Sequence, residues 1–294
     1  MLYLLYSLDA LLMIAMPIAL GVWLARKTKA PWWLFGVGAV TFVGSQVVHI
    51  PLNLGLTLLF KAIWPTARPQ GWHIPLNAFV LGLTAGLCEE AARYVGYRWL
   101  VKKARHWRDA LMLGAGHGGI EAMILGAYVG LVFVNMVVLR QMDLTTLGLT
   151  GQALSKTQQD IATYWSAPWY LALLGAVERL FSLTVHVSLS VMVLQVFTRR
   201  NWSWLALAIG YHMLTDAAAV FGALSGWSPL VIEAVVGLFA LASLAIILSL
   251  RPKGEPLVPP EPELVLISGA TQSPRLASGR KADLDRQLDE SKYA

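Results

Sequence analysis

The chain has 294 residues, of which 56% are hydrophobic and only 14% are charged, and its formal net charge is +6. A water-soluble domain of this length needs a far more polar surface, so the composition excludes a soluble protein and predicts an integral membrane protein whose surroundings are the lipid bilayer. The basic residues fall in short loops between apolar runs, where they set membrane topology, and this placement argues against nucleic acid as a partner.

Seven segments are long and apolar enough to cross a hydrocarbon core of about 30 Å. They are approximately residues 2–24, 32–50, 75–100, 110–138, 168–198, 203–224 and 229–250. The stretch 54–64 is too short to span alone, so it is predicted to be a re-entrant or interfacial helix, with an eighth span as the alternative. The predicted fold is therefore an all-α, polytopic transmembrane helix bundle formed by residues 1–250.

The loops that follow the first, third, fifth and seventh spans carry most of the basic residues. These are Arg26, Lys27 and Lys29; Lys102, Lys103, Arg105 and Arg108; Arg199 and Arg200; and Arg251 and Lys253. Because cytoplasmic loops carry an excess of Lys and Arg, the N-terminus is predicted to be outside and the C-terminus inside. We expect the protein to be located in the plasma (inner) membrane.

Two longer segments lie outside the predicted spans, and their composition predicts different structures. Residues 140–167 carry apolar side chains at loose helical spacing, which fits either a helix in the membrane interface or a plain solvated loop. Residues 251–294 are rich in Pro, Ser, Gly and mixed charge with few aromatic residues, which predicts a disordered cytosolic tail.

The third span contains two adjacent carboxylates and an arginine, in the sequence Cys88-Glu89-Glu90-Ala91-Ala92-Arg93. Each charge costs about 2.5–3.5 kcal/mol inside a membrane, so such groups usually face a partner or a water-filled cavity. Glu89 and Arg93 are one helical turn apart and are expected to pair, whereas Glu90 needs a partner from another helix. Cys88 is interpreted as a small core residue.

Further ionisable residues lie in the fourth, fifth and sixth spans. They are His117 and Glu121; Glu178, Arg179 and His186; and His212 and Asp216. Counted at about 1.5 Å per residue from the basic loops, Glu89, His117, His186 and His212 share a depth of roughly 10–18 Å. The sequence therefore predicts that helix packing brings them to one polar site.

Other intramembrane polar residues are given structural roles. Glu178 and Arg179 lie deeper toward the outer side and are interpreted as a structural ion pair and not as part of the chemistry. His49 and Glu233 lie near outer helix ends, where interfacial water can solvate them.

Carboxylates and imidazoles around a water molecule are suited to hydrolysis, with the carboxylate as general base and the imidazoles stabilising the oxyanion. The same residues could hold zinc, with His117, His186 and His212 as ligands, although the sequence contains no HExxH motif that requires a metal. The alternative is a transporter or channel that uses the same ionisable layer for ion or proton coupling.

These motifs resemble those of the CAAX prenyl protease and bacteriocin-processing clan of intramembrane peptidases, which we group with PrsW-like proteins. The short Glu-Glu-x-x-Arg spacing and the Gly-His-Gly-Gly-Ile-Glu block look most like the YhfC-type branch, over roughly residues 75–224. The resemblance implies that Glu89 or Glu90 activates water, that Arg93 is the basic residue of the first motif, and that His117, His212 and Asp216 complete the later motifs.

The chain also departs from the CAAX proteases. It has one residue fewer between the glutamates and the arginine, and Leu113 where those proteases have Phe, so a prenylated CAAX substrate is not expected.

We therefore expect an intramembrane endopeptidase that cleaves a membrane-embedded or juxtamembrane peptide near the cytosolic side. The candidate catalytic residues are Glu89, Glu90, Arg93, His117, Glu121, His212 and Asp216. His186 is expected to be a further donor or ligand, and Asp216 is expected to fix the tautomer of His212.

Overall fold

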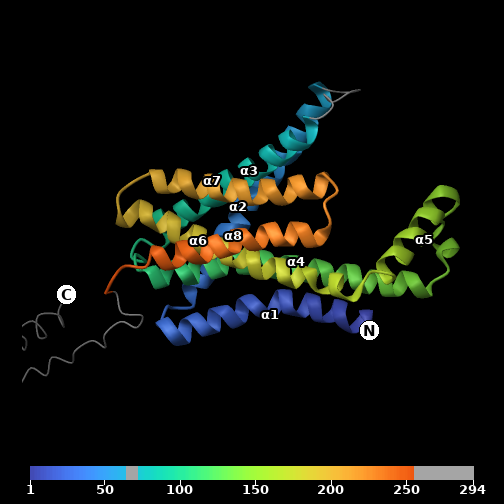
Figure 1. Cartoon of the computed structure of the whole chain (residues 1–294), viewed down its shortest axis with the longest axis horizontal. Helices are drawn as coiled ribbons and strands as arrows, with labels where there is room; N and C mark the ends of the chain where they lie inside the picture. The colour runs from blue at the N-terminus through green and yellow to red at the C-terminus, as the bar shows by residue number, and fades with distance from the viewer. Residues whose placement is uncertain (64–71, 255–294) are drawn as a thin grey trace, which may run out of the picture. The chain divides into compact units, whose positions relative to one another are not determined.

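The computed structural model describes residues 1–63 and 72–254, and within these ranges the chain is helical with no strand. The α-helices, labelled in Figure 1, are α1 (Leu2–Thr28), α2 (Trp33–Ile63), α3 (His73–Val95), α4 (Trp107–Gln141), α5 (Gly151–Trp165), α6 (Leu174–Thr198), α7 (Ser203–Leu224) and α8 (Pro229–Ser249). Three short helices join them: the π-helix η1 (Gly96–Leu100) and the 3-10 helices η2 (Leu144–Leu147) and η3 (Trp169–Leu173). The predicted all-α class is confirmed. Apart from its first four residues, the predicted tail 251–294 lies outside the described residues.

Six helices of the described chain are long and apolar enough to cross a membrane: α1, α2, α4, η3 with α6, α7 and α8. Each corresponds to one of the predicted spans. The remaining predicted span is α3, which carries Glu89, Glu90 and Arg93 and falls outside this apolar set. The inside–outside orientation stays a prediction.

The sequence-based division of α2 is wrong, because residues 32–50 and 54–64 do not form separate elements. One helix of 31 residues runs from Trp33 to Ile63 with Pro51 inside it. Proline removes only its own backbone hydrogen bond, and in an apolar solvent the other peptide groups have no partner except the helix itself. The helix therefore continues through the proline, to a length of about 46 Å.

The segment between α4 and α6 contains a regular helix, α5, with no buried residue. Its C-terminal end is attached to the bundle, since the indole of Trp165 donates to the Met136 carbonyl at 3.2 Å and the Tyr6 hydroxyl donates to the Tyr164 carbonyl at 2.9 Å. The helical alternative for this segment is thus the one observed, whereas its position in the membrane interface stays a prediction.

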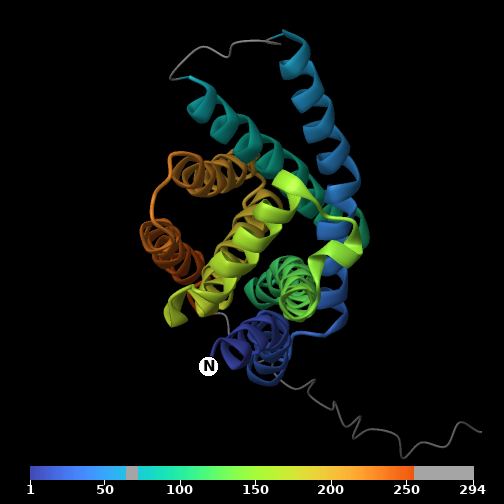
Figure 2. The ribbon, with the colours of Figure 1, turned by 90° about the vertical axis from the view of Figure 1, so that its right-hand side faces the viewer.

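Helix α4 lies between α1, α2 and α6, as Figure 2 shows. Glycines let α2 and α4 approach until their backbones touch. A Cβ atom on Gly38 would lie 2.1 Å from the Leu113 carbonyl oxygen, and one on Gly116 would lie 2.0 Å from that of Phe35. Small residues at such a crossing are typical of helix packing in membranes.

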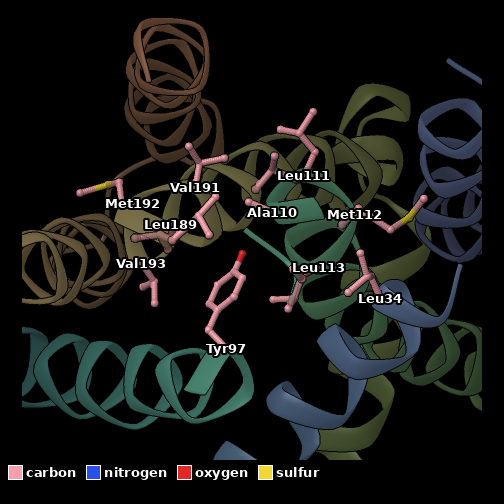
Figure 3. Close-up of a cluster of buried hydrophobic side chains, with 14 of the residues drawn as sticks. Leu34, Tyr97, Ala110, Leu111, Met112, Leu113, Leu189, Val191, Met192 and Val193 are labelled. Atoms are coloured by element: carbon pink, nitrogen blue, oxygen red, sulfur yellow. The ribbon is translucent and has the colours of Figure 1, made fainter. Parts of the chain in front are cut away.

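An apolar core fills the bundle near the basic loops. Figure 3 shows the ring of Tyr97 pointing from η1 toward the cluster formed by α4 and α6 side chains, among them Leu113 and Leu189. The Tyr97 hydroxyl lies 2.9 Å from the hydroxyl of Ser190, so its polar end is satisfied inside the core.

Candidate active site

The first carboxylate of the pair, Glu89, is held by α4 and α2. Its Oε2 lies 3.1 Å from Nε2 of His117, and its Oε1 accepts a hydrogen bond of 3.3 Å from the side-chain amide of Gln46. Behind the imidazole, Nδ1 of His117 lies 2.9 Å from the hydroxyl of Thr41, which donates to the Gly38 carbonyl at 2.7 Å. Because that hydroxyl has one proton, we assign the proton of Nδ1 to the imidazole, which leaves the Nε2 lone pair facing Glu89.

The second carboxylate, Glu90, pairs with Arg93, and both side chains are fully buried. The sequence-based pairing of Arg93 with Glu89 is therefore wrong. Residues three and four positions apart are both within reach on a helix, and here the neighbouring helices decide between them. The expectation that Glu90 needs a partner from another helix is confirmed, because its Oε1 lies 2.7 Å from Nδ1 of His212 on α7.

The same contacts assign the tautomer of His212. With Nδ1 donating to the Glu90 carboxylate, Nε2 is free, and it lies 3.5 Å from Oδ2 of Asp216 and 3.9 Å from Oε2 of Glu89. Asp216 was expected to fix this tautomer, but Glu90 is the nearer partner and is fully buried, whereas the side chain of Asp216 is 38% exposed.

His186 on α6 completes the cluster. Its Nδ1 accepts from Arg93, because a guanidinium can only donate, and its Nε2 lies 2.6 Å from Oε2 of Glu121 on α4. The other oxygen of Glu121 accepts a hydrogen bond of 2.7 Å from Arg179, which also pairs with Glu178. The Glu178–Arg179 pair is thus connected to the cluster through Glu121, and its interpretation as a structural ion pair stays a prediction.

These residues surround a polar cavity of about 90 Å³. Its lining includes Glu89, Glu121, Arg179, His186, His212 and Asp216. The predicted convergence of four helices at one site is therefore observed, with Glu89 from α3, His117 from α4, His186 from α6 and His212 from α7.

Sequence reasoning missed the contributions of α2. Gln46 and Thr41 are polar residues in an apolar helix and contact Glu89 and His117, respectively. Their presence in a span was the available signal, but neutral side chains are common in membrane helices. Cys88 is half-buried and lines an apolar groove between α2 and α3, and His49 contacts Asn53 at 2.9 Å.

The arrangement fits a metal ion by its donor atoms. One ligand atom each from Glu89, His186 and His212 lies within 4.8 Å of the others, so the structure brings Glu89 rather than His117 together with these two histidines. His212 has the arrangement common in metal sites, in which one ring nitrogen donates to a carboxylate and the other is free. The lone pair of His117 and the carboxylate of Glu89, 3.1 Å apart, also need a proton or a cation beside them.

His186 limits this fit, because both of its ring nitrogens are already in contact with Arg93 or Glu121. A metal at this position would have to replace one of the two contacts. Glu89 and His212 are therefore the better placed donors.

Residues 12–240 match the family described as YhfC intramembrane metalloprotease. This chain belongs to the YhfC family. It is 31% identical over 223 residues to the "Uncharacterized membrane protein YhfC" of Bacillus subtilis (strain 168), which covers 73% of this chain and 82% of that protein. No solved structure matches it significantly.

The region shared with the YhfC family includes every residue of the site described above, from Thr41 to Asp216. The family match and the polar cavity therefore concern the same part of the chain.

Proposed function

We propose that this YhfC-family protein is an intramembrane endopeptidase that hydrolyses a peptide bond of a membrane-associated protein or peptide. The observation that carries this proposal is the position of Glu89, a buried carboxylate that lines a polar cavity and lies between the imidazoles of His117 and His212. We further propose that the family belongs with the CAAX prenyl protease and bacteriocin-processing clan and PrsW-like proteins, and that the chain resides in the plasma (inner) membrane.

In the proposed reaction, Glu89 takes a proton from a water molecule as the water oxygen attacks the carbonyl carbon of the scissile bond. The proton then passes from Glu89 to the departing amide nitrogen, so that the C–N bond breaks and a carboxylic acid and an amine are formed. His117, held by Thr41, keeps Glu89 in place. Nε2 of His212, once it carries a proton, donates to the developing oxyanion.

Glu90, Arg93 and Glu121 are proposed to act by positioning the imidazoles. Glu90 holds His212, Glu121 contacts His186, and Arg93 binds both Glu90 and His186. Asp216 lies beside the free nitrogen of His212 at the open side of the cavity, where it can exchange protons with solvent.

We propose zinc as the metal of this site, which His212 would hold together with His117 or His186, with the carboxylate of Glu89 beside it as the general base. A bound zinc ion acts as a Lewis acid that polarises a carbonyl and acidifies water. Metal content of detergent-purified protein tests this point. Stoichiometric zinc that is lost in the His212→Asn variant supports the assignment, and zinc-free active enzyme contradicts it.

Hydrolysis itself can be tested without knowing the substrate. Membranes are incubated with the reconstituted enzyme in water enriched in heavy oxygen, and peptide termini are compared by mass spectrometry. A peptidase creates new C-termini that carry the heavy isotope. The Glu89→Gln variant should produce none, whereas Glu233→Gln, a matched intramembrane control on α8, should retain them.

The assignment of the glutamates is tested by alanine variants. If Glu89→Ala and Glu90→Ala both retain full release of these peptides, neither glutamate is essential and the proposed mechanism is wrong.

A further inference from the structure

The polar cavity extends from the site toward one end of the helices. Besides the site residues, it is lined by Glu178, Ser182 and Val185 on α6, by Thr215 and Ala219 on α7, and by Val236 on α8. Glu178 is near the beginning of α6, and Ala219 is near the end of α7. The cavity thus runs toward the end of the bundle at which α6 begins and α7 ends.

Side-chain exposure increases in the same direction. His186 and His212 are 6% and 3% exposed, whereas Asp216 and Glu178 reach 38% and 44%. The charged chain of Glu178, Arg179 and Glu121 therefore connects the molecular surface with His186.

The opposite side of the site is closed by apolar packing. On the side of the basic loops, α4, α6 and α7 each place a buried side chain about one turn from their site residue, and η1 places Tyr97 about one turn beyond Arg93. The four side chains are Tyr97, Leu113, Leu189 and Ala208, and all are 0% exposed. Water approaching from the basic loops would have to cross this dry, close-packed layer.

We propose that the cavity is a water-filled vestibule that opens to the face at which α6 begins. Water enters through it, and the polar end of a cleaved peptide leaves through it. The product route rests on the proposed function, whereas the water route does not. By the predicted topology this face is the outer one, opposite to the cytosolic access expected from the depth of the site.

The charges of the vestibule select what enters it. Its walls carry the carboxylates of Glu89, Glu121, Glu178 and Asp216 against the one guanidinium of Arg179. Four carboxylates and one cation in a low-dielectric cavity attract positive groups and repel negative ones. Cationic solutes should therefore reach the vestibule more readily than anionic ones.

Cysteine labelling tests the vestibule without requiring activity. In a Cys88→Ala background, Ser182→Cys places a thiol in the wall. Ser188→Cys is the matched control, because Ser188 lies on the same helix, is 0% exposed and contacts Ser243 at 3.1 Å. Sealed vesicles are prepared right-side-out and inside-out, so that each face of the protein can be exposed in turn, and are treated with a membrane-impermeant cationic thiol reagent.

Cysteines at two exposed positions serve as labelling references for the two membrane faces of the protein. Ser155 on α5 lies in the connection that leads to α6, and Lys102 lies in the connection between α3 and α4. We expect the reagent to label Ser182→Cys when it is added on the side from which it labels Ser155→Cys. Added on the side from which it labels Lys102→Cys, it should leave Ser182→Cys unlabelled. Ser188→Cys should react only after denaturation.

Labelling of Ser182→Cys from the Lys102 side, or from neither side while denatured protein reacts fully, would overturn the vestibule. The preference for a cationic over an anionic reagent, normalised to Ser155→Cys, should be about tenfold and should fall in the Glu178→Gln variant. An equal preference at both positions would contradict the charge argument. If Ser182→Cys is labelled as expected but no heavy oxygen is incorporated, the proposed peptidase activity fails and the water route stands.

Discussion

The contact between α2 and α4 should be sensitive to one methyl group. In the Gly38→Ala variant the new Cβ would lie 2.1 Å from the Leu113 carbonyl oxygen and 2.8 Å from the His117 nitrogen. Ordinary contacts of this kind begin near 3.4 Å, and backbone atoms cannot rotate away. The two helices must therefore separate by about 1 Å, at a cost of about 1–3 kcal/mol in strain.

The same separation reaches the site through Thr41, which lies one turn from Gly38. Its hydroxyl is 2.9 Å from Nδ1 of His117, so a shift of about 1 Å lengthens this contact beyond hydrogen-bonding distance. His117 then loses the partner that sets its tautomer. A misplacement of about 1 Å can lower a catalytic rate about a hundredfold, and we expect a loss of this order.

Two measurements check the prediction: the apparent melting temperature in detergent, and the rate at which heavy-oxygen termini appear. Gly36→Ala, on the same helix as Gly38, is the control, since a Cβ atom at Gly36 meets nothing within 4 Å. We expect Gly36→Ala to match the unmodified protein and Gly38→Ala to be impaired in both measurements. Full stability and full activity in Gly38→Ala would refute the close crossing and its link to His117.

Three other outcomes follow from the site. Thr41→Val removes the hydroxyl partner of His117 and should lower the turnover rate with KM little changed; an unchanged turnover rate would contradict the positioning role. Arg93→Met leaves Glu90 buried without its cation and should destabilise the protein by about 3–5 kcal/mol in thermal unfolding, part of which Glu90→Gln should restore in the double variant. Removal of a bound metal by a chelator should lower the melting temperature and abolish peptide release, both recovered by zinc, because a ligand that binds only the folded state stabilises it; insensitivity of both readouts would speak against a metal.

The sequence alone determined the properties that depend on local spacing. Apolar length predicted six helices that the structure contains, and the charges of Glu89, Glu90 and Arg93 indicated that α3 contributes to the polar site. Counting residues from the basic loops placed the site residues of four helices at a common depth in the membrane, because the rise per residue of a helix is fixed. The limits of α2 were missed, because the stretches 32–50 and 54–64 were treated as separate elements.

The tertiary structure decided which groups meet. Spacing allows Arg93 to reach either glutamate, and only the rotation of α3 against α4 and α7 gives Glu89 to His117 and Glu90 to Arg93. That rotation depends on where glycines let backbones touch, which is a property of helix pairs. The closed apolar side and the open polar side of the site also arise only once α6 and α7 lie together, because a cavity is formed by neighbours and not by one segment.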